Sequence, residues 1–127
     1  MERINLHHII FSPKYRRPIF QDREDLGAAC ERLIRHICTL KNITVHAVAI
    51  ETDHVHVFIQ IPNTMSVAKA AMLIKWFSSR WMRIEFPELQ SYPKKTAFWQ
   101  RKYWNRSVGG DARTVKKYIK DQGVNTS

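Results

Sequence analysis

Two histidines alternate with apolar residues in the segment Asp53–Ile59, a spacing that can build a metal site. In a β-strand, His54 and His56 point to one face while Val55 and Val57 point to the other. Two imidazoles whose α-carbons lie about 7 Å apart along a strand can converge on one metal ion. Histidines in strands can also simply satisfy local hydrogen bonds, so the pair alone leaves both interpretations open. The other histidines lack this arrangement and are interpreted as structural: His7, His8, His36 and His46.

A tyrosine and a glutamine near the C-terminus share one face of a predicted helix. Tyr118 and Gln122 are four residues apart, with apolar Val115 and Ile119 on the same face. The amide oxygen of Gln122 is a hard, neutral donor that suits Mg²⁺ or Mn²⁺. A tyrosine at such a position can also be a packing residue. Three lysines flank this face and would attract phosphates: Lys116, Lys117 and Lys120.

The whole chain has a formal net charge of +10, and the positive charge is concentrated in its second half. Residues 1–65 carry eight Lys or Arg against seven Asp or Glu, whereas residues 66–127 carry thirteen against four. An excess confined to one half favours a polyanion-binding face. We therefore expect a nucleic acid partner, the alternative being a basic surface that only contacts solvent.

The composition is that of one globular domain spanning residues 1–127, with 44% apolar residues. The N-terminal segment lacks the apolar core of a signal peptide, and nothing approaches the roughly 20 apolar residues that cross a bilayer. We therefore expect a cytoplasmic protein with no membrane partner. Cys30 and Cys38 lie eight residues apart on a predicted helix, too far apart for a disulfide within the chain.

The hydrophobic pattern predicts the elements that must position these side chains. Apolar runs predict strands at 4–12, 43–50, 54–61 and 98–104, and helical periodicity predicts helices at about 22–42, 66–86 and 111–122. The first six elements follow the order β-α-β-β-α-β, which matches the ferredoxin-like split βαβ arrangement of an α+β domain. This fold has an antiparallel sheet with two helices on one face. The seventh element, which carries Tyr118, can cover part of the other face.

Four finer expectations concern the second and last helices. Asp111 is expected to cap the last helix and Gly123 to end it, while Gly109 and Gly110 are expected to break the chain before it. The apolar residues of the second helix are expected to form one buried stripe, consisting of Val67, Ala70, Ala71, Ile74, Phe77, Trp81 and Ile84.

With these features assembled, the sequence resembles the HUH single-tyrosine transposases of bacterial and archaeal insertion sequences (the TnpA type). The resemblance rests on His54-Val-His56 in a strand and on Tyr118 four residues before Gln122 in a helix. It extends along nearly the whole chain. Further similar stretches occur in the family's order: Phe11–Arg17 after the first strand, Ser78–Trp81 and Glu85–Pro87 in the second helix, and Ser107–Gly110 before the tyrosine helix.

The resemblance implies a site and a reaction. His54, His56 and Gln122 would hold one Mg²⁺ or Mn²⁺, and Tyr118 would attack the scissile phosphate of DNA. A phenol has a pKa near 10 in model peptides, so it needs metal or cationic help to react as a phenolate at neutral pH. The implied product is a 5′-phosphotyrosine with a free 3′-hydroxyl. That link conserves the bond energy, so a later 3′-hydroxyl can rejoin the strand without ATP.

The resemblance also implies partners. The substrate would be single-stranded DNA with hairpin ends, and the active unit would be a homodimer with sites shared between chains. By this resemblance, each site would combine His54 and His56 of one chain with Tyr118 of the other. The short tyrosine helix is compatible with this, because it is expected to need an outside surface. Aromatic residues between Trp76 and Trp104 would stack on bases, with Phe77 and Trp81 kept in the core. Predicted phosphate contacts elsewhere are Lys14, Arg16, Arg17, Lys69, Lys75 and Arg80.

Two alternatives stay open at the level of sequence. One is an HUH nuclease adopted by the host, which cuts repeated hairpins without mobilising an element. The other is a non-catalytic, basic ferredoxin-like module that binds nucleic acid with aromatic residues on its sheet. Only the second makes the paired histidines and the tyrosine helix unnecessary.

Overall fold

Four antiparallel strands form one sheet in the order β2-β3-β1-β4. A computed structural model describes residues 3–91 and 97–124 of the chain. This strand order, with β1 and β3 in the centre, is that of the split βαβ fold and confirms the predicted α+β class. The strands are β1 (Ile4–Phe11), β2 (Thr44–Ile50), β3 (Val55–Gln60) and β4 (Trp104–Gly110).

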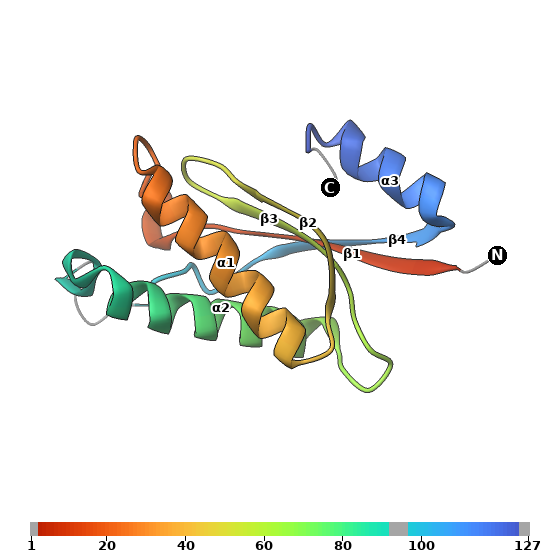
Figure 1. Ribbon diagram of the computed structural model, residues 1–127, viewed down its shortest axis with the longest axis horizontal. Helices are drawn as coiled ribbons and strands as arrows, with labels where there is room; N and C mark the ends of the chain where they lie inside the picture. Colours follow the sequence, from red (N-terminus) through yellow and green to blue (C-terminus); the bar gives the residue numbers. More distant parts are fainter. Residues whose placement is uncertain (1–2, 92–96, 125–127) are drawn as a thin grey trace.

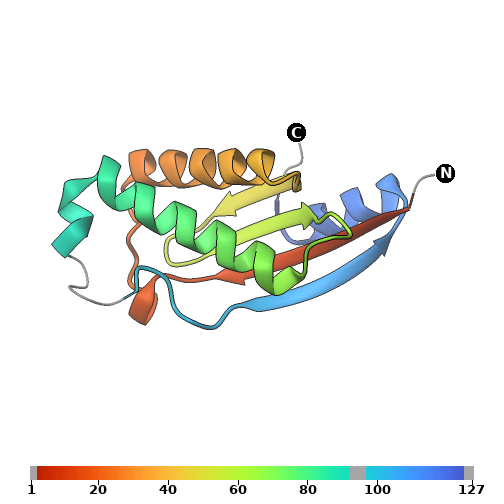
Figure 2. The same ribbon diagram turned by 90° about the horizontal axis from the view of Figure 1, so that it is seen from below.

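The helices lie on both faces of the sheet, with two on one face and one on the other. Figures 1 and 2 show α1 (Glu24–Leu40) and α2 (Val67–Glu85) side by side on one face, and α3 (Ala112–Asp121) over the opposite face. The expected covering of the second face by the last helix is therefore confirmed. The 3-10 turns η1 (Lys14–Arg16) and η2 (Pro87–Ser91) complete the described elements. Among those elements, no helix combines the length and apolarity of a membrane span.

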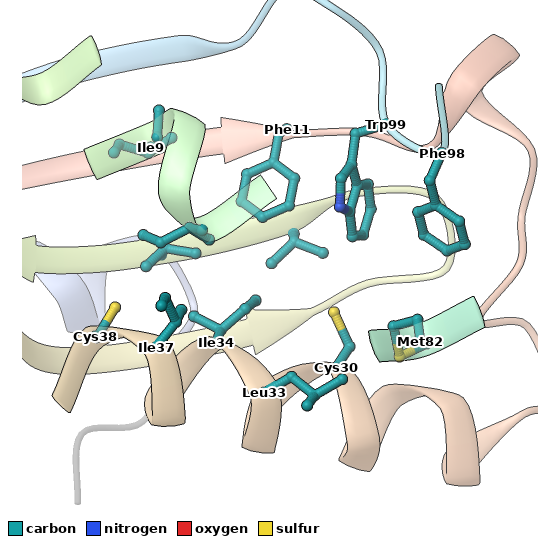
Figure 3. Close-up of a cluster of buried hydrophobic side chains, with 14 of the residues drawn as sticks. Ile9, Phe11, Cys30, Leu33, Ile34, Ile37, Cys38, Met82, Phe98 and Trp99 are labelled. Atoms are coloured by element: carbon teal, nitrogen blue, oxygen red, sulfur yellow. The ribbon is translucent and has the colours of Figure 1, made fainter. Parts of the chain in front are cut away.

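The main core fills the space between the sheet and the helices α1 and α2. Figure 3 shows Ile9 and Phe11 of β1 facing Ile34 of α1, with Phe98 and Trp99 closing one end of the cluster. The thiols of α1 also point into this core as free cysteines, and burial raises the pKa of both: Cys30 and Cys38. They are structural, apolar side chains here.

The fourth strand lies further along the chain than the apolar pattern predicts. Phe98 and Trp99 start the predicted strand 98–104, yet both are buried in the main core, and Trp99 forms only an isolated bridge with Pro13. The strand begins at Trp104 instead, because the aromatic side chains before it serve as core packing outside the ladder. Gly109 and Gly110 lie within β4, so the expected chain break there is wrong.

A tight turn joins β4 to α3, and Gly110 permits it. A β-carbon at Gly110 would lie 2.8 Å from the Thr114 β-carbon, closer than side-chain atoms approach. Asp111 caps α3 as expected, since its carboxylate accepts a hydrogen bond of 2.8 Å from the Thr114 backbone. Gly123 follows α3 with a φ of +81°, the left-handed conformation that ends helices.

The buried face of α2 also departs from the prediction in its second half. Trp81 and Ile84 were expected in the core, but their exposed fractions are 39% and 48%. Ser78 and Met82 take the buried positions instead. The reason is Trp99, whose indole nitrogen donates a hydrogen bond of 3.0 Å to the Ser78 hydroxyl and so draws that face of α2 towards the sheet.

Replacing Ser78 with Ala should destabilise the domain by about 1–3 kcal/mol, because the buried indole N–H of Trp99 would lose its acceptor. Ser79→Ala is the matched control, since the Ser79 hydroxyl bonds to the Trp76 carbonyl within its own helix. Urea denaturation of both variants measures the free energies of unfolding. Equal losses would show that the Trp99 contact contributes nothing.

Candidate active site

One face of the central strands carries the candidate site residues beneath α3. Val55 and Val57 of β3 are buried in the main core, as strand alternation predicts. His56 points to the opposite face, and His54 lies on that side immediately before β3, with both side chains half-buried. The two imidazole centroids are 5.0 Å apart. The pair is therefore brought together on the sheet face that α3 covers.

Each imidazole of this pair has its Nδ1 atom engaged. His54 Nδ1 lies 2.8 Å from a carboxylate oxygen of Asp53, and His56 Nδ1 lies 2.9 Å from Nε2 of His8. Burial, and then the neighbouring His54, lower the pKa of His56, so it is neutral at neutral pH. Counting the contacts of the described residues, Nε2 of each ring is therefore the nitrogen left for a ligand.

An arginine supports the Asp53 carboxylate from a strained turn. Arg16 forms an ion pair of 3.2 Å with Asp53, and the hydrogen bond to His54, together with Arg16, lowers the pKa of that carboxyl. Tyr15 and Arg16 in η1 have φ values of +61° and +50°. Non-glycine residues rarely adopt such values, and those that do are frequently found at functional sites. Arg16, predicted to contact phosphate, is thus linked through Asp53 to the histidine pair.

Helix α3 brings the tyrosine to the same face. Val115 and Ile119 are buried against Leu6 and Phe58 of the sheet, in a second apolar cluster separate from the main core. The half-buried Tyr118 side chain lies beside them, and its hydroxyl is 2.8 Å from Nδ1 of His8. The tyrosine and the histidine pair are therefore neighbours within one chain.

His8 is the residue that sequence reasoning missed. It was interpreted as structural, but it lies between Tyr118 and His56 with a hydrogen bond to each, and only 1% of it is exposed. Its ring stacks on Phe58 with centroids 4.2 Å apart. Burial, followed by the nearby His56 and Arg106, lowers the pKa of His8 to about 4. The imidazole is accordingly neutral.

Comparison with known proteins identifies the family. The model for IS200-like transposases matches residues 3–122. The chain is 32% identical over 118 residues to the transposase for insertion sequence element IS200 of Salmonella typhimurium, covering 91% of this chain and 75% of the relative. The Salmonella typhi transposase of the same element matches equally. The chain belongs to the IS200-like transposase family. Members of this family are transposases, enzymes that carry out DNA transposition.

Solved structures bear out the fold of this transposase. A crystallised Deinococcus radiodurans protein assigned as a transposase superposes with a TM-score of 0.76 at 21% identity, covering 96% of this chain and 92% of its own. A REP-associated tyrosine transposase bound to a REP hairpin has a TM-score of 0.59 at 10% identity. The match covers 93% of this chain and 64% of that protein's chain. At these identities the likeness concerns the fold alone.

An arginine lies beside the tyrosine of this transposase and was also missed. Arg106 pairs opposite His8 in the β1–β4 ladder, and its guanidinium carbon is 5.8 Å from the centre of the Tyr118 ring. Burial raises the pKa of Tyr118, and the Arg106 charge acts in the opposite direction. A cation at this position can stabilise a phenolate or a phosphate near the hydroxyl.

The side chains available to a metal are two imidazoles and an amide. In residues 3–91 and 97–124, no group of three or more His, Cys, Asp and Glu could hold a metal ion. Gln122 follows α3 one turn after Tyr118 and is exposed, so it is free to supply an oxygen. The Nε2 atoms of the two imidazoles and one amide oxygen are compatible with Mg²⁺ or Mn²⁺, although carboxylates are the more usual ligands of these ions.

The predicted phosphate contacts are divided between the two faces of the molecule. Lys116, Lys117 and Lys120 are exposed on α3, where Lys117 pairs with Asp121 at 3.0 Å. Lys69 and Arg80 are exposed on α2, across the sheet from Tyr118.

Three further candidates already have partners. Lys75 is half-buried and donates to the backbone carbonyls of Gln100 and Arg101 at 2.6 and 3.1 Å, so it mainly holds the segment before β4 in place. Lys14 and Arg17 lie 5.6 and 5.8 Å from the centre of the Tyr15 ring.

The predicted base-stacking aromatics are also divided. Trp76 and Trp104 are 56% and 48% exposed, whereas Phe98 and Trp99 are buried. Trp104 lies beside the site, edge-on to His8 at 5.1 Å between ring centroids. Tyr92, within the same stretch of sequence, lies outside the described residues. Trp104 is therefore the exposed aromatic side chain in contact with the site.

Proposed function

We propose that this transposase cuts and rejoins single-stranded DNA through a covalent 5′-phosphotyrosine at Tyr118, with a divalent metal ion bound by His54, His56 and Gln122. One observation carries the proposal: Tyr118, His8 and His56 form a continuous row of hydrogen bonds of 2.8 and 2.9 Å. A nucleophile and two metal-ligand candidates therefore occupy one small region, covered by the helix that carries Tyr118.

The reaction follows from these groups. Bound Mg²⁺ or Mn²⁺ would supply Lewis-acid polarisation of the scissile phosphate. The Tyr118 oxygen loses its proton and forms a bond to phosphorus, while the bond from phosphorus to the 3′ oxygen breaks and that oxygen leaves as a hydroxyl. Arg106 lies where its charge offsets the negative charge on the tyrosine oxygen and phosphate. A 3′-hydroxyl can reverse the step, which joins new ends.

The proposed substrate is single-stranded DNA with hairpin ends. The exposed lysines of α3 lie within two residues of Tyr118 in sequence and can bind the phosphates that flank the cleaved bond: Lys116, Lys117 and Lys120. Trp104 offers an exposed ring on which a base can stack. The REP-associated tyrosine transposase with the same fold was solved with a hairpin bound, which supports this choice.

We further propose a homodimer in which His54 and His56 of one chain work with Tyr118 of the other. The contacts that α3 makes with its own sheet involve a small apolar cluster around Val115 and Ile119. An identical sheet in a second chain offers α3 the same contacts, so exchanging the helix costs little. Within a single chain, α3 packs on its own sheet, so it does not need a second chain to hold its position.

The experiment that tests the reaction is capture of a covalent protein–DNA adduct. The full chain is incubated with 3′-end-labelled, hairpin-ended single-stranded DNA and Mn²⁺, then separated on a denaturing gel. We expect a labelled band at the mass of the protein plus the DNA fragment downstream of the cut. Tight binding with no adduct would instead indicate a non-catalytic nucleic-acid-binding module.

Metal removal should abolish this adduct. EDTA, or replacement of either His54 or His56 with Ala, should reduce adduct formation by at least about 100-fold, because the phosphate loses the polarising charge. His46→Ala is the matched control, since the His46 imidazole is outside the pair and forms a hydrogen bond of 3.2 Å with the Gln60 side chain. Quantified adduct yields with and without added Mn²⁺ provide the measurement. Full activity in EDTA would contradict the metal assignment.

A further inference from the structure

His8 connects the two halves of the proposed site through both of its ring nitrogens. Its Nε2 is 2.9 Å from Nδ1 of His56, and its Nδ1 is 2.8 Å from the Tyr118 hydroxyl. The other aromatic groups around it, Phe58 and Trp104, contact its ring without offering an acceptor. The two hydrogen bonds therefore determine where the proton of His8 lies.

Only two proton arrangements satisfy this row when both imidazoles are neutral. In the first, Tyr118 donates to His8, His8 donates through Nε2 to His56, and the proton of His56 then occupies its own Nε2. In the second, His56 donates through Nδ1 to His8, and His8 donates through Nδ1 to the Tyr118 oxygen. The two arrangements differ in which atom of His56 has a free lone pair.

A metal ligand needs that lone pair on Nε2, because Nδ1 of His56 faces His8. Only the second arrangement provides it. In that arrangement the Tyr118 oxygen accepts a hydrogen bond, so its own proton takes no part in the row. The oxygen keeps this donor after its proton has left, which favours the phenolate.

We infer that His8 is a positioning residue that couples the metal ligand to the nucleophile: it holds the proton of His56 on Nδ1 and donates its own Nδ1 hydrogen to the Tyr118 oxygen. This rests on the proposed function, in which His56 binds a metal ion and Tyr118 attacks DNA. The same role applies whichever chain of a dimer supplies Tyr118.

Asp53 gives the neighbouring ligand a comparable support. Its carboxylate accepts from Nδ1 of His54 at 2.8 Å, which leaves Nε2 of that ring for the ion. Carboxylates and carbonyl oxygens commonly play this part beside metal-binding histidines. An imidazole in that position differs because it has a second nitrogen, and in His8 that nitrogen reaches the nucleophile. His8 therefore does for His56 what Asp53 does for His54, and it contacts Tyr118 as well.

The test compares the unmodified chain with His8→Phe, which retains a ring over Phe58 and removes both hydrogen bonds. Calorimetric titration of each metal-free protein with Mn²⁺ should show about 10- to 100-fold weaker binding by His8→Phe, the usual effect of losing such a partner. At saturating Mn²⁺, the adduct should still form more slowly in His8→Phe, because Tyr118 has lost its donor. His46→Phe, at an imidazole outside the site, should bind Mn²⁺ as the unmodified chain does.

A spectroscopic measurement on the unmodified chain does not depend on the folding of any variant. Nuclear magnetic resonance of isotope-labelled imidazole nitrogens, at saturating Mg²⁺, should place the protons of both His8 and His56 on Nδ1. A His8 proton on Nε2, or equal Mn²⁺ affinity in the unmodified and His8→Phe chains, would overturn the inference. An unmodified chain that binds Mn²⁺ and forms no adduct would overturn the proposed reaction, while weaker binding by His8→Phe would still support the positioning of His56.

Discussion

Replacing Tyr118 with Phe should abolish the covalent adduct and leave hairpin binding within a few fold. The variant keeps the ring that packs beside Phe58 and under Arg106, and removes only the hydroxyl. Loss of the hydrogen bond to His8 should lower the free energy of unfolding by about 1 kcal/mol, which leaves the chain folded. The effect on chemistry is complete because no other atom at that position can form the bond to phosphorus.

The measurement pairs an adduct gel with a binding titration on uncleavable hairpin DNA. Tyr15→Phe and Tyr103→Phe serve as controls. Tyr15 is the closer competitor, since it is 64% exposed and adjacent to Arg16, which binds Asp53. Tyr103 packs against the main core on the other side of the sheet. An adduct that persists in Tyr118→Phe and disappears in Tyr15→Phe would move the nucleophile to η1.

Much of the arrangement around the site was predictable because periodicity reports which face a side chain occupies. Alternation in Asp53–Ile59 placed the histidine pair opposite the core valines, and helical spacing placed Val115 and Ile119 on the face that packs. The element order predicted the split βαβ arrangement, and the structure has that fold, with β1 and β3 as central neighbours in the sheet. These inferences required only local geometry and the packing rules of one common fold.

His8 was missed for a physical reason. In β1, Leu6 on the second face is apolar like Ile9 and Phe11 on the first, because α3 buries part of the second face as well. With both faces apolar, alternation could not show which one His8 occupied. Its role depends on pairing between strands, with His8 opposite Phe58 and next to His56, and such pairing requires the register. The sheet order combined with the apolar pair Ile9 and Phe11 was the available signal.

Two departures from the sequence prediction, the later start of β4 and the exposure of Trp81, have a common cause. Phe98 and Trp99 are aromatic residues, which are typical of strands, but their side chains fill the end of the main core outside the ladder. Because Trp99 bonds to Ser78, α2 presents Ser78 and Met82 to the core and leaves Trp81 exposed. A tertiary contact between distant segments set both outcomes, so local pattern could not predict them.

Mixing Tyr118→Phe chains with His54→Ala chains should restore cleavage, although each variant is inactive alone. If sites are shared, a mixed dimer has one site with both defects and one with none. With random subunit exchange in an equimolar mixture, half of the dimers are mixed, so about a quarter of all sites should be intact. Adduct yield on hairpin-ended single-stranded DNA provides the measurement.

The structure makes the result of this mixing informative in both directions. In a single chain, Tyr118 already lies against its own His8, so an unshared site needs no rearrangement. A shared site needs only the turn at Gly110 and Asp111 to open, since an identical sheet offers α3 the same apolar contacts. Differently tagged chains that co-purify must first show that subunits exchange. If they do and the mixture stays inactive, every site retains one defect, and each Tyr118 serves the histidines of its own chain. Restored cleavage would mean that α3 leaves its own sheet for its partner's, with His8 contacting the partner's tyrosine.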